Sequence, residues 1–208
     1  MQDAALHGAH VPSRDAILDA ATALMARFGY AGTSISKISA ACGSPASSIY
    51  WHFGSKDGIY LAVLRRARQA LVGSLPGTRP AGDTVGERLT AFLDGASAAF
   101  EDHPHDLRLL LGLGMLEEGS GAAAIAELRQ YRLALRQWAT DSLGHVFGLA
   151  DRPAVADELA RFMLSVAGGT AIARWFDGPV TSLPVQQLRI ALLALARHHA
   201  MPVDEGPP

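Results

Sequence analysis

The sequence has one cysteine, two lysines and no long apolar run. A single cysteine, Cys42, excludes an intrachain disulfide and is typical of proteins in a reducing cytoplasm. The longest apolar runs are shorter than the roughly 20 residues that a membrane-spanning helix needs, so no membrane partner is expected. The first dozen residues also lack the basic start and the apolar stretch of a secretory signal. We therefore expect a cytoplasmic protein.

Excess charge of one sign is also missing. The chain carries 18 basic and 20 acidic residues and a net charge of −2, which argues against a general nucleic-acid coat. The two lysines, Lys37 and Lys56, nevertheless lie close together near the N-terminus. Apolar residues are abundant instead: 49% of the 208 residues are hydrophobic and 18% are charged. A chain of this length and composition can bury a substantial core.

Helical spacing of apolar residues recurs along the chain, whereas the period-two alternation of strands is rare. The sequence therefore predicts an all-α fold of about nine helices. Ser13 and Gly29 mark the two ends of the first helix, and Thr33 or Ser34 begins a second, short one. Residues 73–83, rich in glycine and proline, form a linker between helices. Beyond that linker, helices are predicted at 84–101, 106–118, 122–147, 153–176 and 184–199.

A tight turn at residues 42–44 joins the second predicted helix to a third. Gly43 suits this turn because glycine adopts the left-handed conformation without a Cβ clash. Ser44 is predicted as the N-cap of the third helix and Pro45 as its first residue, while Ser55 begins a fourth helix. Two short helices joined in this way form a helix-turn-helix, whose second helix enters the DNA major groove. Its N-terminal residues, which would lie nearest the bases, are Ala46, Ser47 and Ser48.

Residues 13–64 together resemble the N-terminal domain of the TetR family of transcriptional repressors. The matching stretches are AILDAA at 16–21, FGY at 28–30, TSI at 33–35 and IYWHF at 49–53, followed at the family's spacing by Ser55 and Lys56. The resemblance implies an N-terminal DNA-binding domain over residues 1–56, with the helix-turn-helix at about 33–53. It also implies a helical effector-binding and dimerisation domain over residues 57–208.

The resemblance further implies which side chains meet DNA. Tyr50 and His52 match positions that contact phosphates, and Lys56 matches the lysine at the start of the fourth helix. The complete predicted set is Thr33, Ser36, Lys37, Ala46, Ser47, Ser48, Tyr50, His52 and Lys56. Trp51 and Phe53 are expected in the core, and Phe28, Ile38, Ile49 and Phe53 match positions that hold the three helices together.

The base-facing positions carry no Arg, Asn or Gln, the side chains that make bidentate contacts with bases. We therefore expect thymine methyl contacts, serine hydroxyls and the shape of the DNA to provide much of the sequence specificity.

The C-terminal half contains aromatic and aliphatic residues that would line a mostly apolar effector pocket. The predicted lining is Phe92, Phe100, Leu111, Met115, Trp138, Phe162 and Trp175; an ordinary core role is the alternative for each of them. The helices at 153–176 and 184–199 are the candidates for a homodimer interface. In the first of these helices Leu159, Phe162 or Met163, Val166 and Ala173 form one stripe, and the last helix is apolar around most of its circumference.

The sequence thus predicts a dimeric regulator, most simply a repressor that binds a palindromic DNA operator and is released by a small apolar or amphipathic effector. One alternative is a helical ligand-binding or interaction protein that has lost DNA binding. Another is a small helical metalloenzyme that uses His103 and His105 in the EDHPHD stretch. No nucleophile elbow, phosphate loop or paired-cysteine motif is present. We therefore expect no catalytic residue, no metal site and no cofactor.

Overall fold

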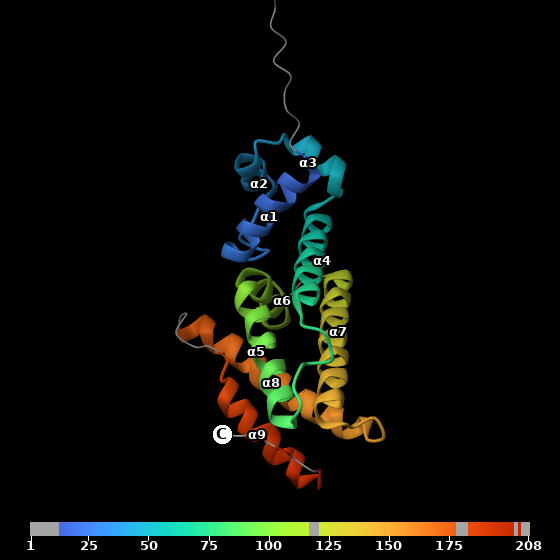
Figure 1. Ribbon diagram of the computed structural model, residues 1–208. Helices are drawn as coiled ribbons and strands as arrows, with labels where there is room; N and C mark the ends of the chain where they lie inside the picture. The colour runs from blue at the N-terminus through green and yellow to red at the C-terminus, as the bar shows by residue number, and fades with distance from the viewer. Residues whose placement is uncertain (1–12, 117–120, 178–182, 202–203, 205–208) are drawn as a thin grey trace, which may run out of the picture. The chain divides into compact units, whose positions relative to one another are not determined.

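A computed structural model of the chain describes residues 13–116, 121–177, 183–201 and 204. Within these residues the chain forms nine α-helices and no β-strand, so the all-α prediction is confirmed (Figure 1). The helices are α1 (Arg14–Phe28), α2 (Ile35–Cys42), α3 (Ala46–Phe53), α4 (Lys56–Ser74), α5 (Val85–Asp102), α6 (Pro104–Leu116), α7 (Ala122–Phe147), α8 (Pro153–Asp177) and α9 (Val185–His198).

Short polar side chains begin several of these helices, as the sequence predicts. The hydroxyl of Ser13 accepts a hydrogen bond from the Ala16 amide, and that of Ser34 accepts one from the Lys37 amide. Ser55 likewise accepts from the Gly58 amide at the start of α4. Each of these bonds satisfies an amide that has no partner inside its own helix. None of the helices in the described ranges is both long enough and apolar enough to cross a membrane.

The start of α3 differs from the prediction by one residue. Pro45, not Ser44, is the N-cap, and it provides no side-chain hydrogen bond. Ser44 precedes the cap and is 1% exposed, and its hydroxyl has no hydrogen-bond partner among the described residues. The proline therefore stands one position before the first helical residue, and the serine that should cap the helix is turned into the protein.

The chain divides into two compact units between Arg65 and Arg66, within α4. In the first unit α1, α2 and α3 contact one another. Its core contains the fully buried side chains of Ile17, Ile38 and Ile49. Ile38 and Ile49 are thus buried, as expected for residues that hold the three helices together. The predicted domain boundary after residue 56 stays a prediction.

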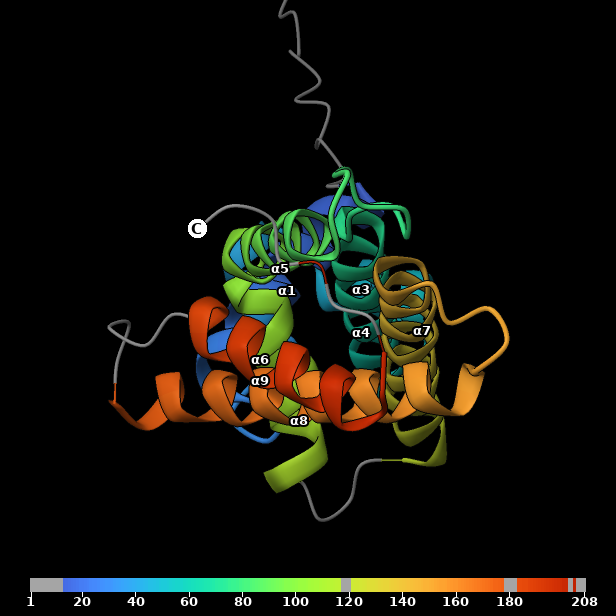
Figure 2. The same cartoon turned by 60° about the horizontal axis from the view of Figure 1, so that its bottom comes forward.

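The second unit is built around α7, which contacts α5, α6 and α8. Figure 2 shows α9 lying alongside α8, and α9 also contacts α5. The predicted linker at 73–83 packs onto this unit, because the indole N–H of Trp138 donates to the Pro76 carbonyl over 2.8 Å. Pro76 also lies close to Gly95 of α5. The segment is thus a fixed connection within the second unit.

Candidate nucleic-acid interface

The turn between α2 and α3 has the geometry of a helix-turn-helix. Gly43 ends α2 in the left-handed conformation, with φ 68° and ψ 14°. The hydroxyl of Ser39 crosses the turn and donates to the Ser44 carbonyl over 2.5 Å. Because α2 and α3 also contact each other directly, the second helix is held at a fixed position on the first.

One face of α3 is turned outward. Ala46, Ser47, Tyr50 and Trp51 are exposed, whereas Ile49 is fully buried on the opposite face. These positions follow the spacing i, i+1, i+4 and i+5, which defines a continuous surface along a helix. Of the predicted DNA-contacting residues in this helix, Ala46, Ser47 and Tyr50 therefore share one outward face. Ser48 and His52 are half-buried beside it.

Trp51 corrects the prediction that it belongs to the core. Its side chain is 81% exposed, and its ring makes an edge contact with the His52 ring at 4.6 Å between centroids. The reason is helical geometry: the buried side of α3 is set by Ile49, and Trp51 lies two residues further on, on the other side of the helix. Phe53, four residues after Ile49, is half-buried beneath the Arg14 guanidinium. The same spacing argument, applied to the sequence, would have identified Trp51 as a surface residue.

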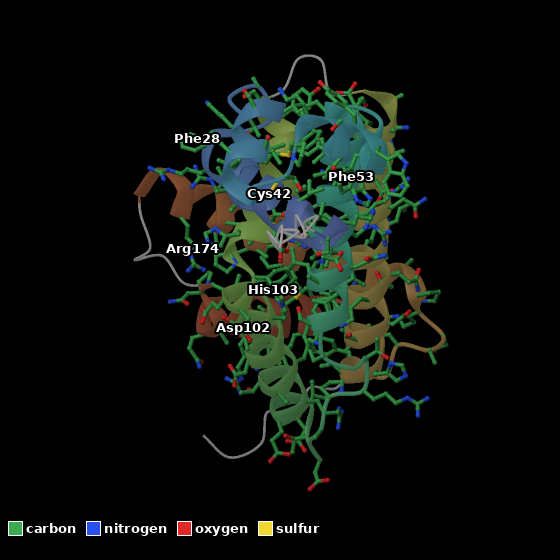
Figure 3. The ribbon with its side chains drawn as sticks, turned by 90° about the horizontal axis from the view of Figure 1, so that it is seen from above. Phe28, Cys42, Phe53, Asp102, His103 and Arg174 are labelled. Carbon is green, nitrogen blue, oxygen red and sulfur yellow. The ribbon has the colours of Figure 1, made fainter. Side chains whose placement is uncertain are left out.

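Phe28 also departs from its expected place in the core. It is 46% exposed and stands at the edge of the first unit, where Figure 3 labels it. The core face of α1 passes through Ile17, Ala21 and Met25. Phe28 is the last residue of the helix, beyond that buried stripe, and its ring is open to solvent.

Three DNA-contacting side chains are predicted near the beginning of α2, and two of them are exposed to solvent. Ser36 and Lys37 are exposed, and the Ser36 hydroxyl lies 2.8 Å from that of Ser34. Thr33 is only 1% exposed, and its hydroxyl donates to the Gly29 carbonyl over 2.8 Å. The Thr33 hydroxyl is thus enclosed and already bonded, and its predicted contact with DNA stays a prediction.

The beginning of α4 carries Lys56, which is half-buried. Its ammonium group lies over the ring of Tyr30, 4.0 Å from the ring centroid. The first amides of a helix lack partners within it and carry the positive end of the helix dipole. An ammonium group at this position strengthens the local preference for an anion such as a phosphate.

Residues 17–63 match the family of bacterial regulatory proteins called the tetR family. This part of the chain is therefore similar to the tetR family. The chain is similar to the HTH-type transcriptional regulator LmrA of Bacillus subtilis, with 32% identity over 89 residues, 42% of this chain and 47% of the relative. It is also similar to the HTH-type transcriptional repressor AcnR of Corynebacterium glutamicum, with 38% identity over 64 residues, 30% of this chain and 34% of the relative. The chain thus matches these curated relatives over less than half of their length.

Solved structures extend the likeness in fold to most of the chain. A tetR-family transcriptional regulator from Streptomyces coelicolor superimposes with a TM-score of 0.67 at 24% identity, covering 90% of this chain and 81% of that one. A transcriptional regulator from Rhodococcus superimposes with a TM-score of 0.72 at 16% identity, covering 93% and 98%. At such identities the likeness shows the fold alone. It agrees with a TetR-type helix-turn-helix followed by a helical second unit.

Within the second unit, the predicted effector residues differ in how deeply they are buried. Phe92 and Trp138 are buried with their ring centroids 5.1 Å apart, and Phe100 is buried on α5 with Phe92. Phe162, in contrast, is 36% exposed on α8, and its predicted place in the effector lining stays a prediction. The side chains of Leu111, Met115 and Trp175 lie outside the described residues.

Tyr131 on α7 is a buried polar residue that the sequence analysis missed. It is 3% exposed, and burial raises the pKa of its hydroxyl well above the ordinary value for tyrosine. The residue one turn earlier, Glu127, accepts a hydrogen bond from the Arg68 guanidinium over 3.1 Å. In the sequence, Glu127 and Tyr131 share one helical face with Trp138 at the spacing i, i+4 and i+11, and this spacing would have indicated that Tyr131 is buried.

The histidines of the EDHPHD stretch do not form a cluster. His103, labelled in Figure 3, has its Nδ1 atom 3.2 Å from the Asp106 carboxylate, while His105 is exposed. In the part of the chain that the structure describes, no group of three or more His, Cys, Asp or Glu side chains is placed to hold a metal ion.

The helices proposed for the dimer interface, α8 and α9, bury part of their apolar surface within the chain itself. Leu159 and Met163 of α8 are buried within the chain, so their predicted place in an intersubunit stripe is wrong. Phe162 on α8 and Ile190 on α9 remain exposed, by 36% and 65%. These two residues, with the half-buried Val166 and Ala173, are among the apolar side chains of α8 and α9 that are not buried within the chain.

Proposed function

We propose that the chain is a DNA-binding transcriptional regulator that acts as a homodimer on a palindromic operator. The observation that carries the proposal is the outward face of α3, where small side chains, Ala46 and Ser47, precede the exposed rings of Tyr50 and Trp51. Small residues at the N-terminal end allow a helix to approach base edges closely in the major groove. The relatives described as an HTH-type regulator and an HTH-type repressor support the same function.

Two lysines provide the electrostatic part of this surface. Lys37 lies near the start of α2 and Lys56 begins α4. Phosphate contacts of this kind position a protein on DNA and make its affinity depend on salt. The outward face of α3 contributes methyl, hydroxyl, phenol and indole groups, so thymine methyl contacts and DNA shape would distinguish sequences there.

The second unit would provide dimerisation and regulation. Two copies joined through α8 and α9 would place their recognition helices on half-sites about one helical turn, roughly 34–36 Å, apart or a multiple of it. A small apolar or amphipathic effector would release the DNA if it binds the other conformation of the protein more tightly. Repression is the form of regulation that we favour.

Selection of bound sequences from a random pool of duplex DNA tests the proposal. We expect one enriched palindrome, bound by the full chain with an affinity that falls steeply as salt rises. Affinity for the selected duplex should exceed that for a scrambled duplex of equal composition by a factor of about 10³ or more. Absence of any salt-sensitive binding would instead favour a helical ligand-binding or interaction protein.

A further inference from the structure

Both lysines of the sequence lie over aromatic rings of a single tripeptide, Phe28-Gly29-Tyr30. The Lys37 ammonium lies 5.4 Å from the centre of the Phe28 ring. The Lys56 ammonium lies 4.0 Å from the centre of the Tyr30 ring. The corner that follows α1 therefore contacts the positively charged ends of two side chains from two other helices.

Tyr30 is fixed on three sides. Its ring packs against the buried ring of Tyr60 with centroids 4.7 Å apart, and Lys56 lies over it. Its hydroxyl donates a hydrogen bond to the carboxylate of Asp57, the residue next to Lys56. The ring thus supports the cation at the start of α4, while the hydroxyl holds the neighbouring anion.

Phe28 has a similar relationship to Lys37. Phe28 is 46% exposed and therefore contributes little to the core. Two cations nevertheless lie over its ring: the Arg27 guanidinium, 4.9 Å from the ring centroid, and the Lys37 ammonium. Lys37 is also anchored to this corner by a hydrogen bond from its Nζ atom to the Gly32 carbonyl, 2.7 Å long. An ammonium group has three donors, so two remain for a phosphate.

We propose that Phe28 and Tyr30 are positioning residues for DNA binding, which hold the ammonium groups of Lys37 and Lys56 in place before the phosphates arrive. The inference rests on the proposed function, because it concerns contacts with DNA. A free lysine side chain loses considerable rotamer freedom when it binds, and a side chain that is already ordered loses less. Cation–π contacts with the rings order the lysine side chains and leave the positive charge of each ammonium group unneutralised.

The hydroxyl of Tyr30 has a second role, which is to hold the Asp57 carboxylate in place. Asp57 stands beside Lys56 at the end of α4 that would face a phosphate. A carboxylate free to turn there would repel the phosphate and compete with it for the ammonium group. The hydrogen bond from Tyr30 holds the Asp57 carboxylate against the α1–α2 corner and leaves Lys56 to the DNA.

Binding of the selected duplex across a range of salt concentrations tests the proposal. Lys56→Ala should lower the slope of log affinity against log salt by about one unit. Tyr30→Leu, which removes the ring, should weaken binding about two- to fivefold and lower the slope similarly. In an Asp57→Asn background, where no carboxylate is freed, the double variant Tyr30→Leu with Lys56→Ala should bind no more weakly than Lys56→Ala. Arg79→Ala, which removes an exposed positive charge from the second unit, is the matched control and should change neither quantity.

Two conservative variants keep the test valid even if Tyr30→Leu folds poorly. Tyr30→Phe keeps the ring and frees Asp57, so binding should weaken while the salt slope stays near that of the wild type. Adding Asp57→Asn should then restore affinity, because the competing carboxylate is gone. Phe28→Leu should weaken binding in the wild-type background and have no further effect in Lys37→Ala.

Two outcomes would overturn the inference. One is that Tyr30→Leu weakens binding by the same factor with and without Lys56. The other is that Asp57→Asn fails to rescue Tyr30→Phe. A wild-type protein that binds no DNA would instead defeat the proposed function itself, before any variant is compared.

Discussion

A β-carbon added to Gly58 would overlap the carbonyl oxygen of Phe53. Phe53 ends α3 and Gly58 lies in the first turn of α4, so these two helices meet with backbone against backbone. The close approach fixes the end of the candidate recognition helix relative to Lys56. It also explains why the residue at this position of α4 is glycine in spite of the low helix propensity of glycine.

Gly58→Ala should therefore separate α3 from α4 and destabilise the first unit. A side chain that meets backbone atoms forces a shift of one helix, and overpacking of this kind costs about 1–3 kcal/mol. We expect a lower midpoint in urea unfolding and weaker DNA binding. Gly73→Ala, in the same helix with open space around the added carbon, is the control and should be neutral or stabilising. Equal effects of the two substitutions would contradict the packing argument.

Ser44 is a position where the chain should gain stability on substitution. Its buried hydroxyl has no hydrogen-bond partner among the described residues, and such a group costs about 1–3 kcal/mol. Ser44→Ala should raise the free energy of unfolding by about 1 kcal/mol. Ser44→Val should raise it further, since an apolar residue before the N-cap packs against the fourth residue of the helix, here the buried Ile49. Chemical denaturation measures both, with the exposed Ser47→Ala as control; a loss of stability in Ser44→Ala would show that the hydroxyl is bonded.

Trp51→Ala distinguishes a contact residue from a core residue. Because the side chain is 81% exposed, the free energy of unfolding should change by less than about 0.5 kcal/mol. Covering such a ring in a complex is worth about 1.5–3 kcal/mol, so affinity for the selected duplex should fall by tenfold or more. Trp51→Phe should recover part of the loss. Unchanged affinity in Trp51→Ala would remove this residue from the interface.

Ile190→Glu tests the assembly that we propose through α8 and α9. A charge at a 65% exposed position is compatible with the folded chain, but it cannot be buried in an interface without a large desolvation cost. We expect the variant to sediment as a monomer at concentrations where the wild type is a dimer. Leu133→Glu, a 64% exposed position on α7, should leave the dimer intact. A dimeric Ile190→Glu protein would place the interface elsewhere.

The helices could be predicted from the sequence because their signals are local. The repeating apolar pattern predicts α7 at 122–147, which is where it lies, and Gly43 ends α2 as expected. Side-chain burial was harder to predict because neighbouring helices decide it. Trp51 and Phe28 are aromatic yet exposed, while Thr33 is polar yet enclosed, since the Gly29 carbonyl one turn away satisfies its hydroxyl.

Contacts between residues far apart in the chain could not be predicted from the sequence pattern. The hydrogen bond from Tyr30 to Asp57 and the placement of Lys56 over the Tyr30 ring join the turn after α1 to the start of α4. No periodicity relates them, so the sequence predicted the lysine but not its partners. The apolar composition of the second unit likewise predicted a core without distinguishing the buried Phe92 from the exposed Phe162.

Asp157 should make the stability of the second unit depend on pH in the acidic range. Two hydrogen bonds from the Arg136 guanidinium, each 2.6 Å long, lower the pKa of this carboxyl, and the charges of Arg136 and Arg161 lower it further. The folded chain therefore binds the proton less readily than the unfolded chain. The stabilisation is complete above the ordinary pKa of aspartate, about 3.9, and is lost as pH falls through the lowered value.

Asp157→Asn isolates this contribution from the other carboxylates. The difference in free energy of unfolding between wild type and variant should be constant near neutral pH and should shrink as pH falls below about 4. Urea unfolding at a series of pH values measures it, with Asp151→Asn at an exposed position of the α7–α8 connection as the control. A difference that stays constant down to the lowest accessible pH would mean that Arg136 does not hold the ionised carboxylate.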